Sequence, residues 1–242
     1  MLEHFLTRVE QYNPALNALI WLDKDGARQT ADEADAALDK GQVWGPLHGV
    51  PMTVKESYQV AGSPTTWGNT AFRNNVTDTD AVTVTRLKKA GVNMFGKSNV
   101  PYMLADWQSF NEIYGTTHNP WDVTRTPGGS SGGSAAALAA GLTALDAGSD
   151  IGASIRNPAH YCGVFGHKPT YGVMTPRGQS LPESYATADI SVIGPLARSA
   201  SDLETAMQVM AGPDEVDAIG WTLSLPAPRK RRLSEFRVAL KF

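Results

Sequence analysis

The sequence of 242 residues contains one cysteine, Cys162. A single cysteine cannot form an intrachain disulfide, and it excludes zinc sites built from several cysteines. The five histidines show no pair at a convincing metal-ligand spacing. Neither a Walker motif nor a G-x-G-x-x-G motif occurs, so nucleotide binding has no support. We therefore expect no metal and no other cofactor.

A marked excess of one charge is also absent. The formal net charge is −3 and the sequence pI is about 5.9, which argues against a nucleic-acid or polybasic membrane-binding protein. No apolar stretch approaches the length of a membrane span, and the first residues show no signal peptide. The expectation is a soluble, cytoplasmic protein without nucleic-acid or membrane partners.

Short β-prone segments alternate with helical patterns along the chain. Helices are predicted at residues 2–9, which Asn13-Pro14 would end, and at 27–40, 81–90, 134–142 and from 201 onward. Strands are predicted at residues 16–22, 50–54, 92–95, 143–147 and 190–193. This alternation predicts an α/β fold, with a mixed, largely parallel β-sheet covered by α-helices on both faces. Residues 1–242 are predicted to form a single domain.

Two of these helices carry capping signals. Asp78 or Asp80 would cap the helix at 81–90. Ser201 with Glu204 forms a capping-box pattern ahead of the following helix.

The C-terminal part of the sequence contains two segments of different composition. The basic run from Arg229 to Arg232 follows two prolines and indicates a solvated linker, at residues 213–235. Beyond it the apolar residues Phe236, Val238, Leu240 and Phe242 occupy alternate positions. That pattern predicts either a C-terminal edge strand or a chain that stops in mid-domain.

The densest chemical signal is the segment Pro127-Gly128-Gly129-Ser130-Ser131-Gly132-Gly133-Ser134. Its glycines let backbone N–H groups approach a reacting group closely and permit positive φ. Ahead of a helix, such a loop gathers donors toward a negative oxygen. The same composition also occurs in ordinary tight loops, which the motif alone leaves open.

Two further segments carry a candidate nucleophile and a candidate base. Residues 149–158 place Ser154 after a small-residue turn, whose N–H groups can point at one carbonyl oxygen, as an oxyanion hole requires. Residues 49–56 deliver Lys55 at the end of a β-prone run. Burial there would lower the pKa of the lysine and let it act as a general base. Taken singly, a polar turn and a solvated lysine explain these segments at least as well.

In combination, the three segments resemble the motifs of the amidase signature family, closely and in the same order. In that family a lysine after a Gly-Val-Pro strand precedes the glycine- and serine-rich signature, and the nucleophilic serine lies in an Asp-Ile-Gly-Gly-Ser-Ile-Arg segment. The matching positions are Lys55, Ser130 and Ser154. Agreement continues at residues 95–99, 115–121, 162–164 and 166–170, and the resemblance extends from the first helix to about Gly212.

The resemblance implies an amidase that hydrolyses a small-molecule carboxylic amide at a C–N bond other than a peptide bond, through an acyl-enzyme. Neutral Lys55 would take a proton from Ser130, which takes one from the nucleophile Ser154. Ser130 is expected on a cis peptide bond. The main-chain donors of the oxyanion hole would be Ile151, Gly152, Ala153 and Ser154. The supporting residues would be Ser131, Asp150 and Arg156.

Two features depart from the family pattern. Ala153 stands where a second glycine is usual, so its N–H would serve the oxyanion hole provided that its φ is negative. The chain is also shorter than family members, whose C-terminal half completes the sheet and builds much of the pocket. The alternative is therefore an inactive or partner-dependent fragment or subunit, including an amidotransferase-type glutaminase subunit. A homo-oligomer or a complementing chain would then be the partner.

A rival interpretation makes Ser130 the nucleophile, because residues 128–132 also fit the G-x-S-x-G elbow of α/β-hydrolases. Only His160 and His167 follow it, both too close in the chain for that fold. The absence of any Ser-x-x-Lys motif removes the penicillin-binding type of serine–lysine enzyme.

Large side chains near the motifs are candidates for the substrate pocket, although packing is their commoner role. They are Trp67, Tyr102, Trp107, Gln108 and Tyr161. Their aromatic character favours an apolar or aryl amide, with esters and urethanes as further substrates.

Overall fold

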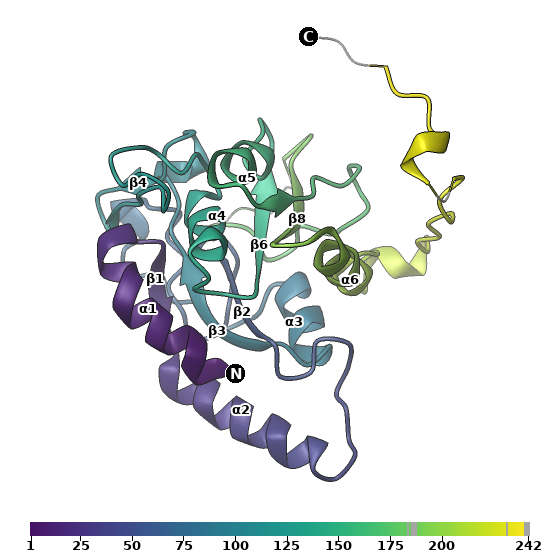
Figure 1. Cartoon of the computed structure of the whole chain (residues 1–242), viewed down its shortest axis with the longest axis horizontal. Helices are drawn as coiled ribbons and strands as arrows, with labels where there is room; N and C mark the ends of the chain where they lie inside the picture. Colours follow the sequence, from purple (N-terminus) through teal and green to yellow (C-terminus); the bar gives the residue numbers. More distant parts are fainter. Residues whose placement is uncertain (183, 185–187, 231, 240–242) are drawn as a thin grey trace.

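The computed structural model describes residues 1–182, 184, 188–230 and 232–239. Its centre is a six-stranded sheet in the order β1-β3-β2-β6-β8-β7 (Figure 1). The strands are β1 (Leu19–Leu22), β2 (Pro51–Lys55), β3 (Asn93–Ser98), β6 (Leu145–Asp150), β7 (Phe165–Gly166) and β8 (Val192–Ala197). The central strands β3, β2 and β6 are parallel, and the outer strands β1, β8 and β7 pair antiparallel. The predicted mixed α/β sheet with a parallel core is confirmed.

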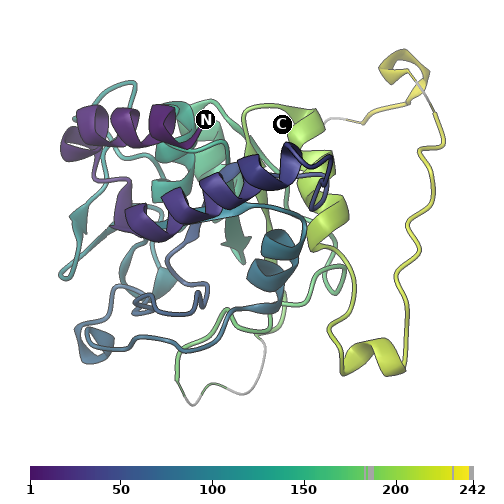
Figure 2. The same cartoon turned by 90° about the horizontal axis from the view of Figure 1, so that it is seen from below.

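Helices cover both faces of the sheet (Figures 1 and 2). One apolar cluster joins Phe95 and Leu196 of the sheet to α1 (Leu2–Leu16), α4 (Gly132–Ala139), α5 (Arg156–Cys162) and Ala27 of α2 (Lys24–Leu38). A second cluster joins Met52, Val54 and Ile193 to α3 (Val82–Lys89) and α6 (Ala200–Met210). Because strand side chains alternate between faces, the sheet contributes to both clusters and is buried on both sides.

The first helix runs further than the sequence pattern predicted. It passes through Pro14 and ends at Leu16, and the C-cap residue Asn17 adopts a left-handed conformation with φ of 48°. The Asn13 side chain accepts hydrogen bonds from the N–H groups of Ala18 and Leu19, each at 2.9 Å. These bonds hold the turn into β1. The helix is therefore ended by the hydrogen bonds of the Asn13 side chain and not by Pro14.

Both predicted caps are wrong. The residue that caps α3 is Ala81, without a side-chain bond, because Asp80 is engaged by the N–H of Ala61 and by Lys88. Helix α6 is capped by Ser199, whose hydroxyl accepts from the N–H of Asp202 at 3.1 Å. The cap therefore lies two residues before the predicted Ser201, whose hydroxyl instead bonds the Ser199 hydroxyl.

Short elements complete the described chain. They are the hairpin strands β4 (Phe110–Asn111) and β5 (Gly115–Thr116), and the 3-10 helices η1 (Thr70–Phe72), η2 (Tyr102–Leu104), η3 (Asp217–Ile219) and η4 (Leu233–Glu235). None of the helices in the described part of the chain combines the length and the apolar character that a membrane crossing requires.

The segment after α6 starts against the body and then leaves it (Figure 2). The Arg86 guanidinium donates to the carbonyls of Met210 and Gly212 at 2.9 and 3.0 Å, and Asp214 is buried in an ion pair with Arg177. The first part of the predicted linker 213–235 is thus tied to the core. The predicted edge strand is not formed at residues 236–239, and its remaining members Leu240 and Phe242 lie outside the described residues.

Candidate active site

Lys55 is the last residue of β2, a strand whose five residues are all buried. Its side chain is fully buried, and its Nζ donates to Ser130 Oγ at 2.6 Å and to Ser149 Oγ at 3.0 Å. The central position of β2 in the sheet places the lysine at the carboxyl end of the parallel strands, where ligand sites of α/β folds form. Lys55 and Ser130 are therefore brought together as the sequence predicted.

Ser130 lies in the glycine-rich loop that enters α4. The Gly129–Ser130 peptide bond is cis. Gly128 has φ of +86°, and a Cβ on Gly129 would lie 2.6 Å from the carbonyl oxygen of Asp106. Glycine is required at both positions, because the loop turns through a left-handed conformation and passes close to another backbone.

Ser154 follows β6 at the turn before α5 and is 8 % exposed. Its carbonyl accepts the N–H of Ser131 at 3.1 Å, which joins its loop to that of Ser130. Among the described residues, the Ser154 hydroxyl forms no hydrogen bond, so the expected contact between the Ser130 and Ser154 hydroxyls is not made in this structure. Both serines line the same cleft.

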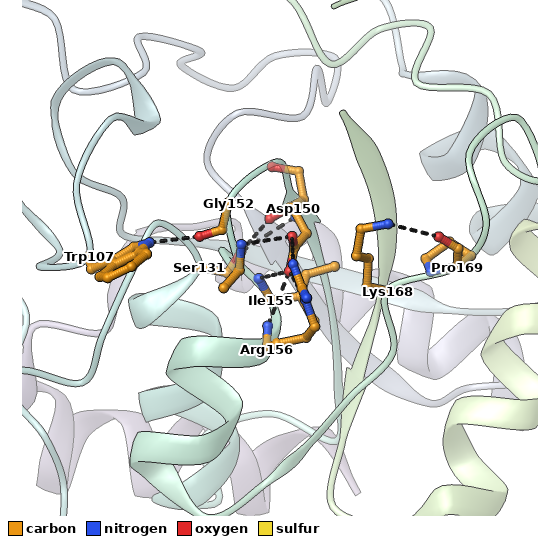
Figure 3. Close-up of polar contacts among 10 residues, drawn as sticks. Trp107, Ser131, Asp150, Gly152, Ile155, Arg156, Lys168 and Pro169 are labelled. Carbon is orange, nitrogen blue, oxygen red and sulfur yellow. Dashed lines mark hydrogen bonds and ion pairs between the residues drawn. The ribbon is translucent and has the colours of Figure 1, made fainter. Parts of the chain in front are cut away.

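The Asp150 carboxylate organises the Ser154 loop (Figure 3). It binds the Arg156 guanidinium through two bonds, of 2.9 and 3.1 Å, and accepts the N–H groups of Ala153 and Ile155 at 3.0 and 2.9 Å. Burial acts to raise the pKa of Asp150, but the hydrogen bonds from Arg156 and the backbone hold that pKa below its ordinary value. The ionised carboxylate thus fixes the turn that carries Ser154.

This arrangement changes the set of available oxyanion donors. Ala153 has φ of +76°, so the condition of a negative φ is not met, and its N–H is bound to Asp150. In the described part of the chain, the N–H groups of Ile151, Gly152 and Ser154 have no hydrogen-bond partner. The Gly152 carbonyl accepts from Trp107 Nε1 at 2.8 Å, which orients the Gly152–Ala153 peptide unit. Three of the four expected donors are therefore free, and Ala153 is not.

Ser149 is a site residue that the sequence analysis did not single out. Its hydroxyl accepts from Lys55. Its backbone N–H donates to the Ser131 hydroxyl and its carbonyl accepts from that hydroxyl, each at 3.4 Å. Its position before Asp150 was visible in the sequence, but its contact with Lys55 depends on the pairing of β2 with β6. Ser131 therefore supports Ser149 as well as the loop of Ser130.

Burial lowers the pKa of Lys55 to about 7. The carboxylates of Asp150, Asp146 and Glu56 act in the opposite direction but do not offset the loss of hydration. A lysine whose pKa is near neutrality is partly unprotonated at physiological pH and can accept a proton from a neighbouring hydroxyl.

A second pair of buried charges lies beside the site. Glu56 accepts the N–H groups of Thr66 and Trp67 at 2.5 and 2.9 Å, and so holds the loop that brings Trp67 to the cleft. Burial lowers the pKa of Lys97 to about 8, and the charge of Glu56 opposes this shift. Lys97 donates to Thr65 Oγ1 at 3.0 Å in the same loop.

The cleft beside Ser154 has a volume of about 1350 Å³. Of the pocket residues predicted from sequence, Trp67 and Trp107 line it, while Tyr102, Gln108 and Tyr161 do not. The sequence analysis missed the lining residues Tyr171, Met174 and Trp221. Tyr171 and Met174 come just after the matching residues 166–170, whereas Trp221 lies beyond the region of resemblance. No group of three or more His, Cys, Asp or Glu side chains suited to a metal ion occurs in the described residues.

The sequence is similar to known proteins of one family. The family model described as Amidase matches residues 1–241. An acylamidase of Rhodococcus erythropolis is 40% identical over 217 residues, which is 90% of this chain and 45% of that protein. One subunit of the glutamyl-tRNA(Gln) amidotransferase of Azoarcus sp. is 43% identical over 214 residues, covering 88% of this chain and 43% of that protein.

The fold is likewise similar to solved structures. The structure of 6-aminohexanoate cyclic dimer hydrolase complexed with substrate aligns with a TM-score of 0.82 and 32% sequence identity. The alignment covers 94% of this chain and 45% of that structure. The chain thus spans slightly less than half the length of the proteins that it matches.

Proposed function

The chain belongs to the Amidase family, and on that premise we propose that it hydrolyses a carboxylic amide to an acid and an amine or ammonia, with Ser154 as nucleophile. The observation that carries the proposal is the 2.6 Å contact between the buried Lys55 Nζ and Ser130 Oγ. A base of lowered pKa bonded to a hydroxyl is the arrangement that activates a serine nucleophile. One relative is an acylamidase, which is consistent with amide hydrolysis.

The proposed reaction passes protons among Lys55, Ser130 and Ser154 in three stages. Unprotonated Lys55 takes the Ser130 proton as Ser130 takes the proton of Ser154, and Ser154 Oγ bonds to the amide carbonyl carbon. The C–N bond then breaks as Ser130 gives a proton to the leaving nitrogen and regains one from the Lys55 ammonium. Water, deprotonated through the same groups, attacks the ester and releases the acid. Ser154 recovers its proton in that last step.

The charge that develops on the carbonyl oxygen requires donors that are already in place. We assign this role to the N–H groups of Ile151, Gly152 and Ser154, which are free in the described structure. Trp107 holds the Gly152–Ala153 peptide unit next to these donors, and Asp150 fixes the turn through Arg156 and Ala153. The lysine comes from the end of β2, whereas the donors belong to the loop that carries the nucleophile itself.

The cleft favours an apolar or aryl amide. Trp67, Trp107, Tyr171 and Trp221 contribute aromatic surface to its walls. Aromatic side chains contribute large apolar contact areas to such pockets. Esters would react by the same path, since an alkoxide leaves more easily than an amine.

A second candidate function is that of a glutaminase subunit, which releases ammonia only with partner chains. It is favoured by the 43% identity to a glutamyl-tRNA(Gln) amidotransferase subunit. The residues assigned to the chemistry are the same in both candidates.

The test measures amine release from anilides of apolar acids and ammonia release from glutamine. The variants compared are Ser154→Ala and, as a matched control, Ser224→Ala at an exposed position. Anilide hydrolysis that Ser154→Ala abolishes and Ser224→Ala retains supports the amidase. Ammonia release from glutamine only when amidotransferase partner chains are added supports the second candidate. Amide hydrolysis that survives Ser154→Ala contradicts both.

A further inference from the structure

Asp146 is a buried carboxylic acid that the proposed reaction does not use. It lies in β6, is 0 % exposed, and its Oδ2 accepts from Thr53 Oγ1 at 2.6 Å. Its other oxygen, Oδ1, is buried without a hydrogen-bond partner among the described residues. A carboxylate oxygen left unpaired in the interior is costly. Packing alone does not call for an acid in this position.

The sheet places Asp146 on the side of the catalytic lysine. Thr53 of β2 pairs with Asp146 of β6, and Thr53 and Lys55 lie on the same face because they are two residues apart. On the other flank of β2, Lys55 pairs with Ser98, whose hydroxyl bonds Ser134 of α4 at 2.8 Å. Lys55 and Asp146 therefore share a buried polar layer between the sheet and α4.

The other charges near Lys55 are already balanced. Asp150 is bound to Arg156 and to backbone N–H groups, and Glu56 is bound to the Thr66–Trp67 backbone and faces Lys97. Helix α4 and strand β8, which pack against this layer, contain no titratable residue. Tyr58, the remaining titratable neighbour, donates its hydroxyl to the Gly148 carbonyl. Among the residues that the structure describes, Asp146 is thus the acid near Lys55 that has no other cation as a partner.

We propose that Asp146 is a positioning residue of the proposed hydrolysis, whose carboxylate stabilises the Lys55 ammonium that forms when the lysine accepts a proton. Within the described residues no ion pair of 4.0 Å or less links Lys55 to an acid. The carboxylate therefore acts on Lys55 by long-range electrostatic attraction, and it does not form an ion pair that would draw the Nζ away from Ser130. This role rests on the proposed function, but its physical basis does not require turnover.

The electrostatics agree with this geometry. Burial raises the pKa of Asp146 to about 7, while the nearby hydroxyls of Thr53, Ser134 and Ser98 favour the ionised form. The Asp146 charge in turn raises the pKa of Lys55 against the effect of burial. Removing this charge must therefore lower the pKa of the lysine.

The experiment is an NMR titration of the Lys55 side chain in protein labelled with 13C at lysine Cε. The Lys55 signal is assigned by its loss in Lys55→Arg. In Asp146→Asn, which keeps the shape and can still accept from Thr53, the pKa of Lys55 is expected to fall by about 1. Asp32→Asn, at an exposed position of α2, is the matched control and should leave it unchanged.

The variant Thr53→Val gives a second test with the same NMR measurement. It removes the donor that favours ionised Asp146, so the pKa of Lys55 should fall in the same direction by a smaller amount. An unchanged pKa of Lys55 in folded Asp146→Asn overturns the proposal, and if that variant does not fold, an unchanged value in Thr53→Val does so. The readout needs no hydrolysis. Loss of the proposed function would appear instead as Ser154-independent or absent amide cleavage in the wild-type protein.

Discussion

Lys55 Nζ and Ser130 Oγ lie 2.6 Å apart, although 75 positions of the chain separate them. The contact depends on two distant features, the end of a central strand and a glycine-rich loop that passes close to another backbone. Since the lysine is fully buried, its ammonium form loses hydration and its pKa falls to about 7. The side chains proposed as the base and the proton relay are therefore in direct contact.

The reactivity of Ser154 is expected to rise with pH through an inflection near 7. Only unprotonated Lys55 accepts a proton, and its pKa is about 7, so the reactive fraction grows as the pH increases past that value. The measurement is the rate of labelling by a fluorophosphonate between pH 5 and pH 9, a range of about two units on either side of that pKa. A rate that falls as the pH rises through 7 would contradict the assignment of the base.

Replacement of Lys55 by arginine is expected to reduce the labelling rate by about 100-fold or more, because a guanidinium stays protonated and cannot act as a base. Lys40→Arg, at an exposed position after α2, is the matched control and should leave the rate unchanged. Equal rates for the two variants would show that Lys55 takes no part in activation.

Asp150→Asn should inactivate the site while the fold persists. The change removes the bidentate ion pair with Arg156 and weakens the bonds to the N–H groups of Ala153 and Ile155 that fix the nucleophile turn. We expect at least about a 10-fold loss of labelling, because nucleophiles and their donors require close positioning. Asp122→Asn, in the exposed Asp122–Arg125 pair, is the control and should change nothing. Similar activity in both variants would contradict this role of Asp150.

Ala153→Gly should stabilise the protein by about 1 kcal/mol, since a φ of +76° strains every residue with a Cβ. Chemical denaturation measures the change. The contrasting variant is Ala36→Gly on the exposed face of α2, which should lower the free energy of unfolding by about 1 kcal/mol. A destabilised Ala153→Gly would mean that the alanine methyl group makes contacts that outweigh the backbone strain.

Glu56→Gln is expected to lower the free energy of unfolding by about 3 kcal/mol, as for other buried charges that lose their partner. The change leaves Lys97 without its opposite charge and weakens the bonds to the loop of Trp67. Glu33→Gln, on the exposed face of α2, should stay close to the wild-type value. Equal stabilities in denaturant would show that the Glu56 charge does not hold the loop.

Sequence patterns predicted the core of the fold because short β-prone segments mark β2, β3, β6 and β8, although β3 and β6 also carry polar residues such as Lys97 and Asp146. The ends of elements were less accurate. Asn13 bonds residues on the far side of its own turn, and Asp80 is drawn away from the α3 cap by Ala61 and Lys88. Such competition between partners depends on tertiary contacts that local spacing does not encode.

The site shows the same division. The motifs pointed to Lys55 and Ser130, and the structure brings the two together. The donor at Ala153 was expected on the condition of a negative φ, whereas the turn sets φ to +76° and gives the N–H to Asp150. Ser149 and Asp146 were missed because their relation to Lys55 arises from the pairing of β2 with β6. Strand register between distant segments is not readable from one sequence.

The central claim is that Ser154 is a nucleophile activated through Ser130 and Lys55. The most direct test is peptide mapping by mass spectrometry after treatment with a fluorophosphonate, on the wild-type protein and on Ser154→Ala. The account predicts a stoichiometric adduct on Ser154 that is absent from the variant. A folded wild-type protein without an adduct, or an adduct on Ser130 that persists in Ser154→Ala, would contradict it.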